Sequence, residues 1–158
     1  LKDIYSKLGV ISSIEDQTLK LTKQNINLPE LLELDLSKAP DIAQTIAVTC
    51  YGLGVSCKLK GLHTLKIKET DRLQALYNEL TKLGAYIKIT GNSLELASSS
   101  KFIPNRSIPS YNDHRMAMAF APLAIKIPIK IENAEVVSKS FPTFWSDLEE
   151  INFIIDRR

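Results

Sequence analysis

Positively charged side chains stand at the starts of several expected helices, where the helix dipole opposes them. In the stretch SYNDHRMAMAF, residues 110–120, Asn112 or Asp113 is suited to cap a helix, and His114 and Arg115 follow at once. A cation there destabilises the helix by roughly 0.3–1 kcal/mol. A bound anion would reverse that balance, because the free N–H groups of a helix start and the arginine fork both bind phosphate and carboxylate.

A second helix start of this kind lies in the stretch KIKETDRL. Lys68 precedes the expected cap, which is Thr70 or Asp71, and Arg72 falls in the first turn. If this helix start lies beside the first, three or more cations gather in one place and favour an anionic ligand.

A third start lies in the stretch SKSFPTFW, where Lys139 precedes Ser140 as the expected cap and Pro142 falls in the first turn. Two unit charges 4 Å apart repel by about 4 kcal/mol at an effective dielectric constant of 20. Cations from three helix starts that meet at one rim would therefore require an anion. The residues alone leave a second interpretation open, in which each cation points into water and is screened by salt.

Asp41 and Glu69 are the acidic side chains that could move protons at such a site. Asp41 follows Pro40 in the first turn of an expected helix, and Glu69 lies between Lys68 and Arg72. Structural roles stay open for both, as a helix-start carboxylate and as a surface ion pair. Beside a cationic pocket, the two carboxylates would be suited to moving protons on a bound anionic substrate.

An internal repeat orders the elements that carry these residues. An apolar helical stripe with one aromatic member recurs around Tyr5, Tyr77 and Trp145, at spacings of 72 and 68 residues. After the first two stripes, Gly9 and Gly84 are expected to end the helices, and two strands joined by a tight turn follow each.

A second type of helix, apolar nearly all round, alternates with the first. It is expected from Pro40 to Gly54 and again over residues 112–124, and aligning Asp41 with Asp113 gives a spacing of 72 residues once more. A helix of this composition is buried. Strands are expected after both copies, over residues 55–62 and 128–137, and Pro122 is expected to interrupt or bend the second helix.

The repeating order of elements is strand, buried helix, strand, amphipathic helix, strand, strand. This order predicts an α/β protein built by internal duplication, with repeats at about residues 1–72 and 73–140 and a final helix over 140–151. The first stripe starts at residue 1 with no capping residue before it. We therefore expect residues 1–158 to form a single, incomplete domain of a longer protein.

Composition limits which binding partners and which cellular compartment are expected for this protein. The net charge is only +2 over 158 residues, so neither a nucleic acid nor a membrane surface is the expected partner. No apolar run reaches the length of about 18 residues needed to span a membrane, and no signal peptide is recognisable, so the expected location is the cytoplasm. Cys50 and Cys57 fit buried thiols in a reducing compartment and indicate neither a zinc site nor a disulfide framework.

Four stretches together resemble the 5-enolpyruvylshikimate-3-phosphate (EPSP) synthase family, from about residue 1 to about residue 152. They are DLSKAPDIAQTIAV, LKIKETDRLQALYNELTKLGA, YNDHRMAMAFAPLA and SKSFPTFWSDL. The resemblance implies an inside-out α/β barrel of three βαβαββ units in each of two domains, with the active site between the domains. This chain would be the later part of the second domain, and its partner would be the missing N-terminal domain.

The reaction implied by the resemblance joins the 5-hydroxyl of shikimate 3-phosphate to the enolpyruvyl group of phosphoenolpyruvate and releases phosphate. It requires no metal and no organic cofactor. Asp41 resembles the carboxylate that holds the shikimate hydroxyls and accepts the 5-hydroxyl proton. Glu69 resembles the acid that exchanges a proton with the phosphoenolpyruvate methylene, and Lys68 resembles the lysine that bridges the two substrates. Thr64 stands where some members carry an asparagine that contacts the substrate.

The same resemblance implies that the remaining cations bind phosphoenolpyruvate. Arg72, Arg115 and Lys139 resemble the groups that bind its phosphate and carboxylate, and His114 lines the same pocket. Two alternatives stay open, a UDP-N-acetylglucosamine enolpyruvyl transferase and a non-catalytic anion-binding domain. Because the shikimate phosphate site would lie in the missing domain, the chain alone is expected to turn over no substrate.

Overall fold

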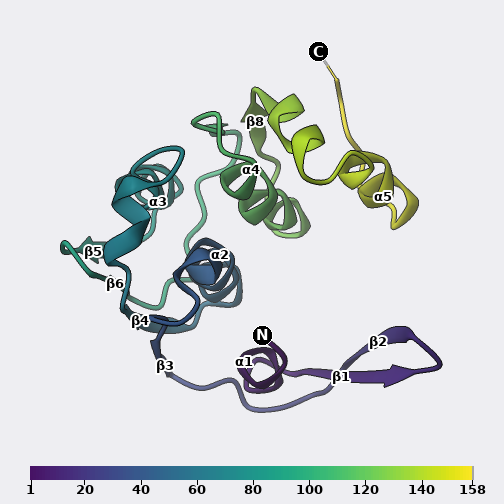
Figure 1. Ribbon diagram of the computed structural model, residues 1–158, viewed down its shortest axis with the longest axis horizontal. Coiled ribbons are helices and arrows are strands. Elements are labelled where there is room, and N and C mark those ends of the chain that lie inside the picture. The colour runs from purple at the N-terminus through teal and green to yellow at the C-terminus, as the bar shows by residue number, and fades with distance from the viewer. Residues whose placement is uncertain (158) are drawn as a thin grey trace.

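A complete βαβαββ unit occupies the middle of the chain, in the computed structural model that describes residues 1–157 (Figure 1). Its elements are β3 (Leu31–Asp35), the 3₁₀ turn η1 (Pro40–Ile42) leading into α2 (Ala43–Leu53), β4 (Ser56–Lys60), α3 (Arg72–Lys82), β5 (Ile87–Ile89) and β6 (Ser93–Leu96). The strands form one sheet in the order β3-β4-β6-β5, with β3 and β4 parallel and the other two pairs antiparallel. This is the order of elements predicted from the repeat.

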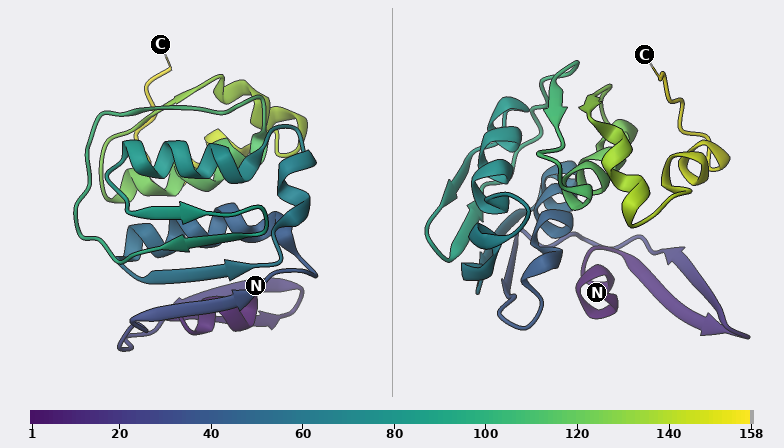
Figure 2. Two further views of the ribbon diagram at one scale, coloured as in Figure 1. Left: turned by 90° about the vertical axis from the view of Figure 1, so that its left-hand side faces the viewer. Right: turned by 45° about the horizontal axis from the view of Figure 1, so that its top comes forward.

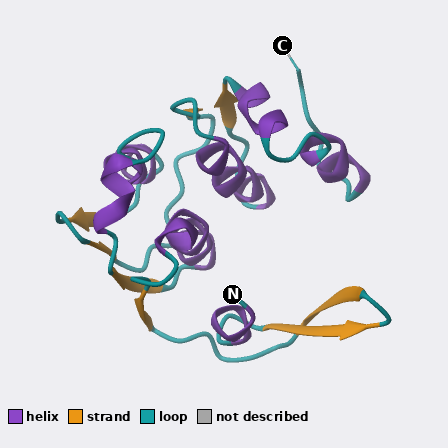
Figure 3. Cartoon of the chain, in the orientation of Figure 1, coloured by secondary structure: helices purple, strands orange, loops and turns teal. Residues whose placement is uncertain are grey.

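Helices fill the inside of the fold and strands lie outside them. Helices α2, α3 and α4 (His114–Phe120) lie side by side, and the four-stranded sheet covers α2 and α3 (Figures 2 and 3). The buried faces of α2 include Ile46, Ala47, Cys50 and Tyr51, so this helix is enclosed as its apolar composition predicts. The burial of Leu73, Leu76 and Leu80 on α3 follows the predicted stripe, and it fixes which face of α3 points inward.

Two sets of elements follow one another in the same order along the chain. The first set is α1 (Lys2–Ser6), β1 (Val10–Glu15), β2 (Thr18–Lys23), β3, α2 and β4, and the second is α3, β5, β6, β7 (Ser107–Pro109), α4 and β8 (Lys130–Glu132). Between β4 and α3 lies a 3₁₀ helix, η2 (His63–Ile67), and after β8 come η4 (Ala134–Lys139) and α5 (Phe144–Glu150). Strands β7 and β8 pair in parallel, as β3 and β4 do.

The β1–β2 hairpin extends away from the rest of the chain (Figure 1). Asp16 and Gln17 form its two-residue turn, both with positive φ (47° and 64°), which is the pattern of a type I′ turn. Among the described residues, β1 and β2 pair only with each other. No helix within residues 1–157 is long and apolar enough to cross a membrane.

The second buried helix changes form at Pro122, as the sequence predicts. Helix α4 ends at Phe120 and continues as a 3₁₀ helix, η3 (Ala121–Ile125), because proline has no N–H to donate to the preceding turn.

Two local predictions are wrong. The strand expected through residues 128–137 stops at Glu132, where Asn133 takes a left-handed conformation (φ 52°), and Val136 and Val137 are buried against α4 instead. Ser140 is not the cap of the last helix. That helix begins at Phe144.

Candidate functional site

The guanidinium group of Arg72 is the centre of an ion-pair cluster that joins three segments of the chain. Arg72 is the first residue of α3, and its side chain is 1% exposed. Its Nε donates to Asp113 Oδ2 (2.6 Å) and its Nη1 to Asp41 Oδ1 (3.0 Å). Its Nη2 donates to Glu69 Oε2 (2.6 Å) and to Asp113 Oδ1 (3.2 Å). Three carboxylates therefore fix the position of one buried cation.

Asp41 is the point where three cations meet. Its Oδ1 lies 3.2 Å from Lys68 Nζ as well as 3.0 Å from Arg72 Nη1, and its Oδ2 lies 3.6 Å from Arg115 Nη2. Burial raises the pKa of Asp41, but the bond from Lys68 and the charges of Arg115, Lys68 and Arg72 outweigh burial, and the pKa lies below its usual value of 3.8. Asp41 is thus an ionised carboxylate at neutral pH.

The starts of α3 and α4, which carry Arg72 and Arg115, are capped by aspartates. Asp71 Oδ1 accepts a bond from Gln74 N–H (3.0 Å), and Asp113 Oδ1 accepts one from Arg115 N–H (2.9 Å). The positive end of α4 therefore has one carboxylate as its cap and a second, Asp41, beside the Arg115 side chain. These two negative charges explain how Arg115 is tolerated where the helix dipole opposes a cation.

The cluster is formally balanced, which differs from the cationic pocket expected from the sequence. Lys68, Arg72 and Arg115 face Asp41, Glu69 and Asp113. The two groups inside the cluster, Arg72 and Asp113, are closed to solvent at 1% and 0% exposure. The side chains of Lys68, Asp41, Arg115 and Glu69 are 32%, 34%, 41% and 46% exposed, so these four can reach a solute directly.

Asp113 is the residue whose role sequence reasoning missed. It was predicted only as a possible cap, yet it also binds the guanidinium of Arg72 through both oxygens. A signal for this role was present, since Asp113 aligns with Asp41 at the repeat spacing of 72 residues. The two repeat-related aspartates bind the same arginine from two sides.

Three other predicted residues lie outside this network. Lys139 ends η4 with an exposed side chain, and His114, half-buried, begins α4. Within residues 1–157 neither forms a hydrogen bond or ion pair with the cluster through its side chain. Thr64, on η2, has a buried hydroxyl oxygen without a hydrogen-bond partner in the described structure.

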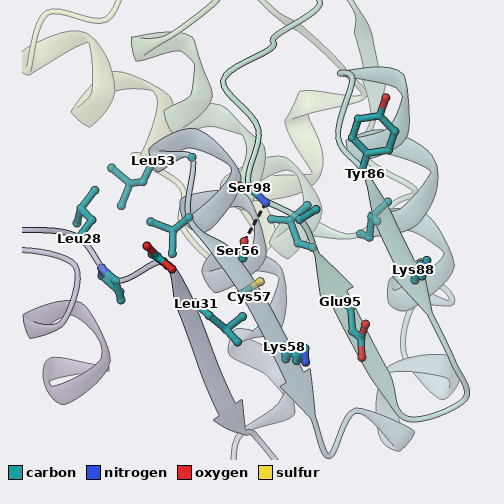
Figure 4. Close-up of a pocket in the computed structure, with 17 residues that line it drawn as sticks. Leu28, Leu31, Leu53, Ser56, Cys57, Lys58, Tyr86, Lys88, Glu95 and Ser98 are labelled. Atoms are coloured by element: carbon teal, nitrogen blue, oxygen red, sulfur yellow. Dashed lines mark hydrogen bonds between the residues drawn. The ribbon is translucent and has the colours of Figure 1, made fainter.

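A hollow on the sheet is remote from this chemistry. It has a volume of about 900 Å³ and lies on the outer face of the four-stranded sheet, near Tyr86, Lys88 and Glu95 (Figure 4). None of the predicted site residues lines it. Within residues 1–157, no group of three or more His, Cys, Asp and Glu side chains is placed to hold a metal ion.

Acid is expected to weaken the fold through Asp41. A carboxylate whose pKa is lowered by folding stabilises the folded state above its unfolded pKa, here 3.8, and this contribution disappears as the pH falls through the folded-state pKa. The unfolding free energy of the chain, measured with urea between pH 5 and pH 2, should therefore fall more steeply for the unmodified chain than for Asp41→Asn. The exposed Glu95→Gln is the control, and curves of equal slope for the unmodified chain and Asp41→Asn would contradict the expectation.

Two solved structures share this architecture. EPSP synthase from Acinetobacter baumannii superposes with a TM-score of 0.69 at 22% identity, covering 94% of this chain and 37% of that one. The enolpyruvyl transferase NikO from Streptomyces tendae gives a TM-score of 0.64 at 13% identity, covering 95% of this chain and 34% of that one. At these identities the likeness concerns the fold, and it confirms the α/β class predicted from the repeat.

The sequence identifies the particular family within that class. The model of the EPSP synthase (3-phosphoshikimate 1-carboxyvinyltransferase) family matches residues 1–148, and the chain belongs to this family. The 3-phosphoshikimate 1-carboxyvinyltransferase of Bacteroides fragilis is 43% identical over 155 residues, which are 96% of this chain and 37% of that protein. The resemblance found in the sequence is confirmed, and the chain spans a little over a third of the length of such relatives.

Proposed function

We propose that the protein containing this chain transfers the enolpyruvyl group of phosphoenolpyruvate to the 5-hydroxyl of shikimate 3-phosphate. The acceptor oxygen bonds to C2 of phosphoenolpyruvate while C3 gains a proton. Phosphate then leaves C2, and C3 loses a proton to restore the double bond. Membership of the EPSP synthase family and the name of the Bacteroides fragilis relative support this assignment.

The observation that carries the proposal is the Asp41 carboxylate in contact with Lys68, Arg72 and Arg115. An ionised carboxylate is suited to accept the proton of an attacking hydroxyl. Lys68 and Arg115 are partly exposed and can turn from Asp41 to the phosphate and carboxylate of a substrate. Arg72 is closed to solvent, so a direct bond from Arg72 to phosphoenolpyruvate requires the Glu69 or Asp41 carboxylate to move.

Glu69 is the second acid of the proposed mechanism. One of its oxygens receives a bond from Arg72, and its side chain is 46% exposed. Its free oxygen is therefore available to give a proton to C3 and take one back. His114 and Lys139 complete the proposed phosphoenolpyruvate site; His114 begins α4, Lys139 ends η4, and these two helices pack against each other.

The rest of the same protein is the proposed partner of this chain. Ile14 pairs with Leu19 and Ser12 with Leu21, so Ile14, Leu19 and Leu21 share one face of the β1–β2 hairpin, and all three are exposed. In the complete βαβαββ unit, strands β5 and β6 form the hairpin that corresponds to β1 and β2, and β6 also pairs with β4. By the same repeat, β2 would pair along its free edge with a strand from outside residues 1–158. A cytoplasmic location, with Cys50 and Cys57 as free thiols, completes the proposal.

The proposal is tested on the full-length protein by measuring phosphate release. Phosphoenolpyruvate with shikimate 3-phosphate is expected to give turnover, and phosphoenolpyruvate with UDP-N-acetylglucosamine is not. Residues 1–158 alone are expected to give none with either acceptor. Turnover with the sugar nucleotide only would transfer the assignment to the other enolpyruvyl transferase, and binding of phosphoenolpyruvate without any turnover would favour a non-catalytic anion-binding domain.

A further inference from the structure

A tight turn in an unusual conformation leads directly into the ion-pair cluster. Asp113 N–H donates to the Ser110 carbonyl (3.0 Å), and the two residues between them, Tyr111 and Asn112, both have positive φ (57° and 54°). Two such residues in succession form a type I′ turn, for which Asn and Gly are the favoured residues. Asn112 suits this conformation, whereas the bulky Tyr111 does not. Some contact must therefore hold Tyr111 in place.

That contact comes from helix α3. The Tyr111 hydroxyl donates to Glu79 Oε1 (2.6 Å), and the Glu79 side chain is 0% exposed. Glu79 Oε2 lies 2.5 Å from Lys82 Nζ, which balances its charge. Burial and the neighbouring Glu79 carboxylate raise the pKa of Tyr111, so the hydroxyl keeps its proton and remains a donor at neutral pH.

Helix α3 thus holds the turn at two points. Arg72 binds Asp113 and Glu79 binds Tyr111. Arg72 and Glu79 are seven residues apart, which is two helical turns, and they lie on the same face of α3. Burying the Glu79 carboxylate contributes little to stability compared with an apolar residue of similar size. The position of this carboxylate matters more than its contribution to stability, because its bond to Tyr111 fixes the backbone just before Asp113, His114 and Arg115.

We propose that Tyr111 and Glu79 are positioning residues, which hold the 110–113 turn so that Asp113 meets Arg72 and Arg115 faces the phosphoenolpyruvate site. This inference rests on the proposed function for its kinetic readout. Neither residue is expected to touch a substrate. Both act through the backbone that carries Asp113 and Arg115.

The test compares variants of the full-length protein. Tyr111→Phe removes one hydrogen bond to a charged group, and the KM for phosphoenolpyruvate is expected to rise about tenfold. The KM for shikimate 3-phosphate should change less than about twofold. A merely structural role would reduce the fraction of folded enzyme, and therefore the maximal rate, while leaving both KM values unchanged. Tyr86→Phe is the matched control, because Tyr86 is exposed on the outer face of the sheet (Figure 4).

Two further variants guard against a failure of Tyr111→Phe to fold. Glu79→Gln keeps the shape of the side chain and weakens the same bond, so it should raise the same KM. Tyr111→Gly also lacks the bond but removes the strain, because glycine adopts positive φ freely, so it should raise this KM less than Tyr111→Phe does. Equal KM values for phosphoenolpyruvate in the unmodified protein, Tyr111→Phe and Glu79→Gln would overturn the proposal.

A second readout separates this inference from the proposed function. The Arg72 Nε–H proton, bonded to Asp113, should exchange slowly with solvent in an NMR spectrum of the full-length protein. In Tyr111→Phe its resonance should shift and exchange faster, whether or not the protein transfers an enolpyruvyl group. An unchanged Nε–H signal overturns the positioning role, and absence of turnover in the unmodified protein overturns the proposed function alone.

Discussion

Replacing Arg72 with leucine is expected to lower the free energy of unfolding of this chain by about 3–5 kcal/mol. The Arg72 and Asp113 side chains are 1% and 0% exposed, and Asp113 receives two of the four bonds that Arg72 donates. Removing the guanidinium leaves a buried carboxylate whose remaining bond comes from Arg115 N–H. An unpaired buried charge is among the most costly defects that a single substitution can produce. The loss is measured by urea unfolding of residues 1–158.

Two further variants separate the cost of the unpaired buried charge from the cost of losing any long side chain. Arg106 is exposed, so Arg106→Leu should change the unfolding free energy by less than about 0.5 kcal/mol. The pair Arg72→Leu and Asp113→Asn should together cost less than the two single changes added, because each removes the other's unpaired charge. A cost for Arg72→Leu as small as that of Arg106→Leu would show that the cluster does not stabilise the fold.

The order of elements could be predicted because it depends on local patterns. The stripes around Tyr5 and Tyr77, the glycines after them and the two buried helices each carry their own signal, and the repeat confirms one copy by the other. The last helix repeats the same stripe, but its start and the element before it were predicted wrongly. Buried contacts of Val136 and Val137 with α4 turned an expected strand into a 3₁₀ helix and moved the helix start to Phe144. Tertiary packing of this kind leaves no local pattern in the sequence.

Which side chains gather in the ion-pair cluster was predicted better than which of them bind one another. Asp41, Lys68, Glu69, Arg72 and Arg115 were expected to converge and do so. The burial of Arg72 could not be predicted, because a residue in the first turn of a helix is usually exposed, and only the fold brings Asp113 against it. The Tyr111–Glu79 bond likewise joins residues 32 apart in the chain, and neither residue type signals the other.

Asp41→Asn is expected to lower the turnover number of the full-length protein by about 10²–10⁴-fold, the usual contribution of a general base. The amide keeps an oxygen that can accept a bond from Arg72 or Lys68, but it cannot take the proton of the attacking hydroxyl. Substrate binding should suffer less than turnover, because Lys68 and Arg115 are freed from their carboxylate partner and remain to bind the anionic groups. The rate is measured as phosphate release at saturating phosphoenolpyruvate and shikimate 3-phosphate.

Asp35→Asn provides the matched control for that change. Asp35 is an exposed aspartate at the end of β3, six residues before Asp41, and its side chain accepts bonds only from Ser37 among the described contacts. The control should therefore keep its turnover number within about twofold, since surface changes away from a site have small effects. If Asp41→Asn also kept its rate, the convergence of three cations on Asp41 would serve the fold alone. The proton would then have to leave the acceptor hydroxyl through another group, and Glu69, which is also bonded to Arg72 and is partly exposed, is the candidate in this cluster.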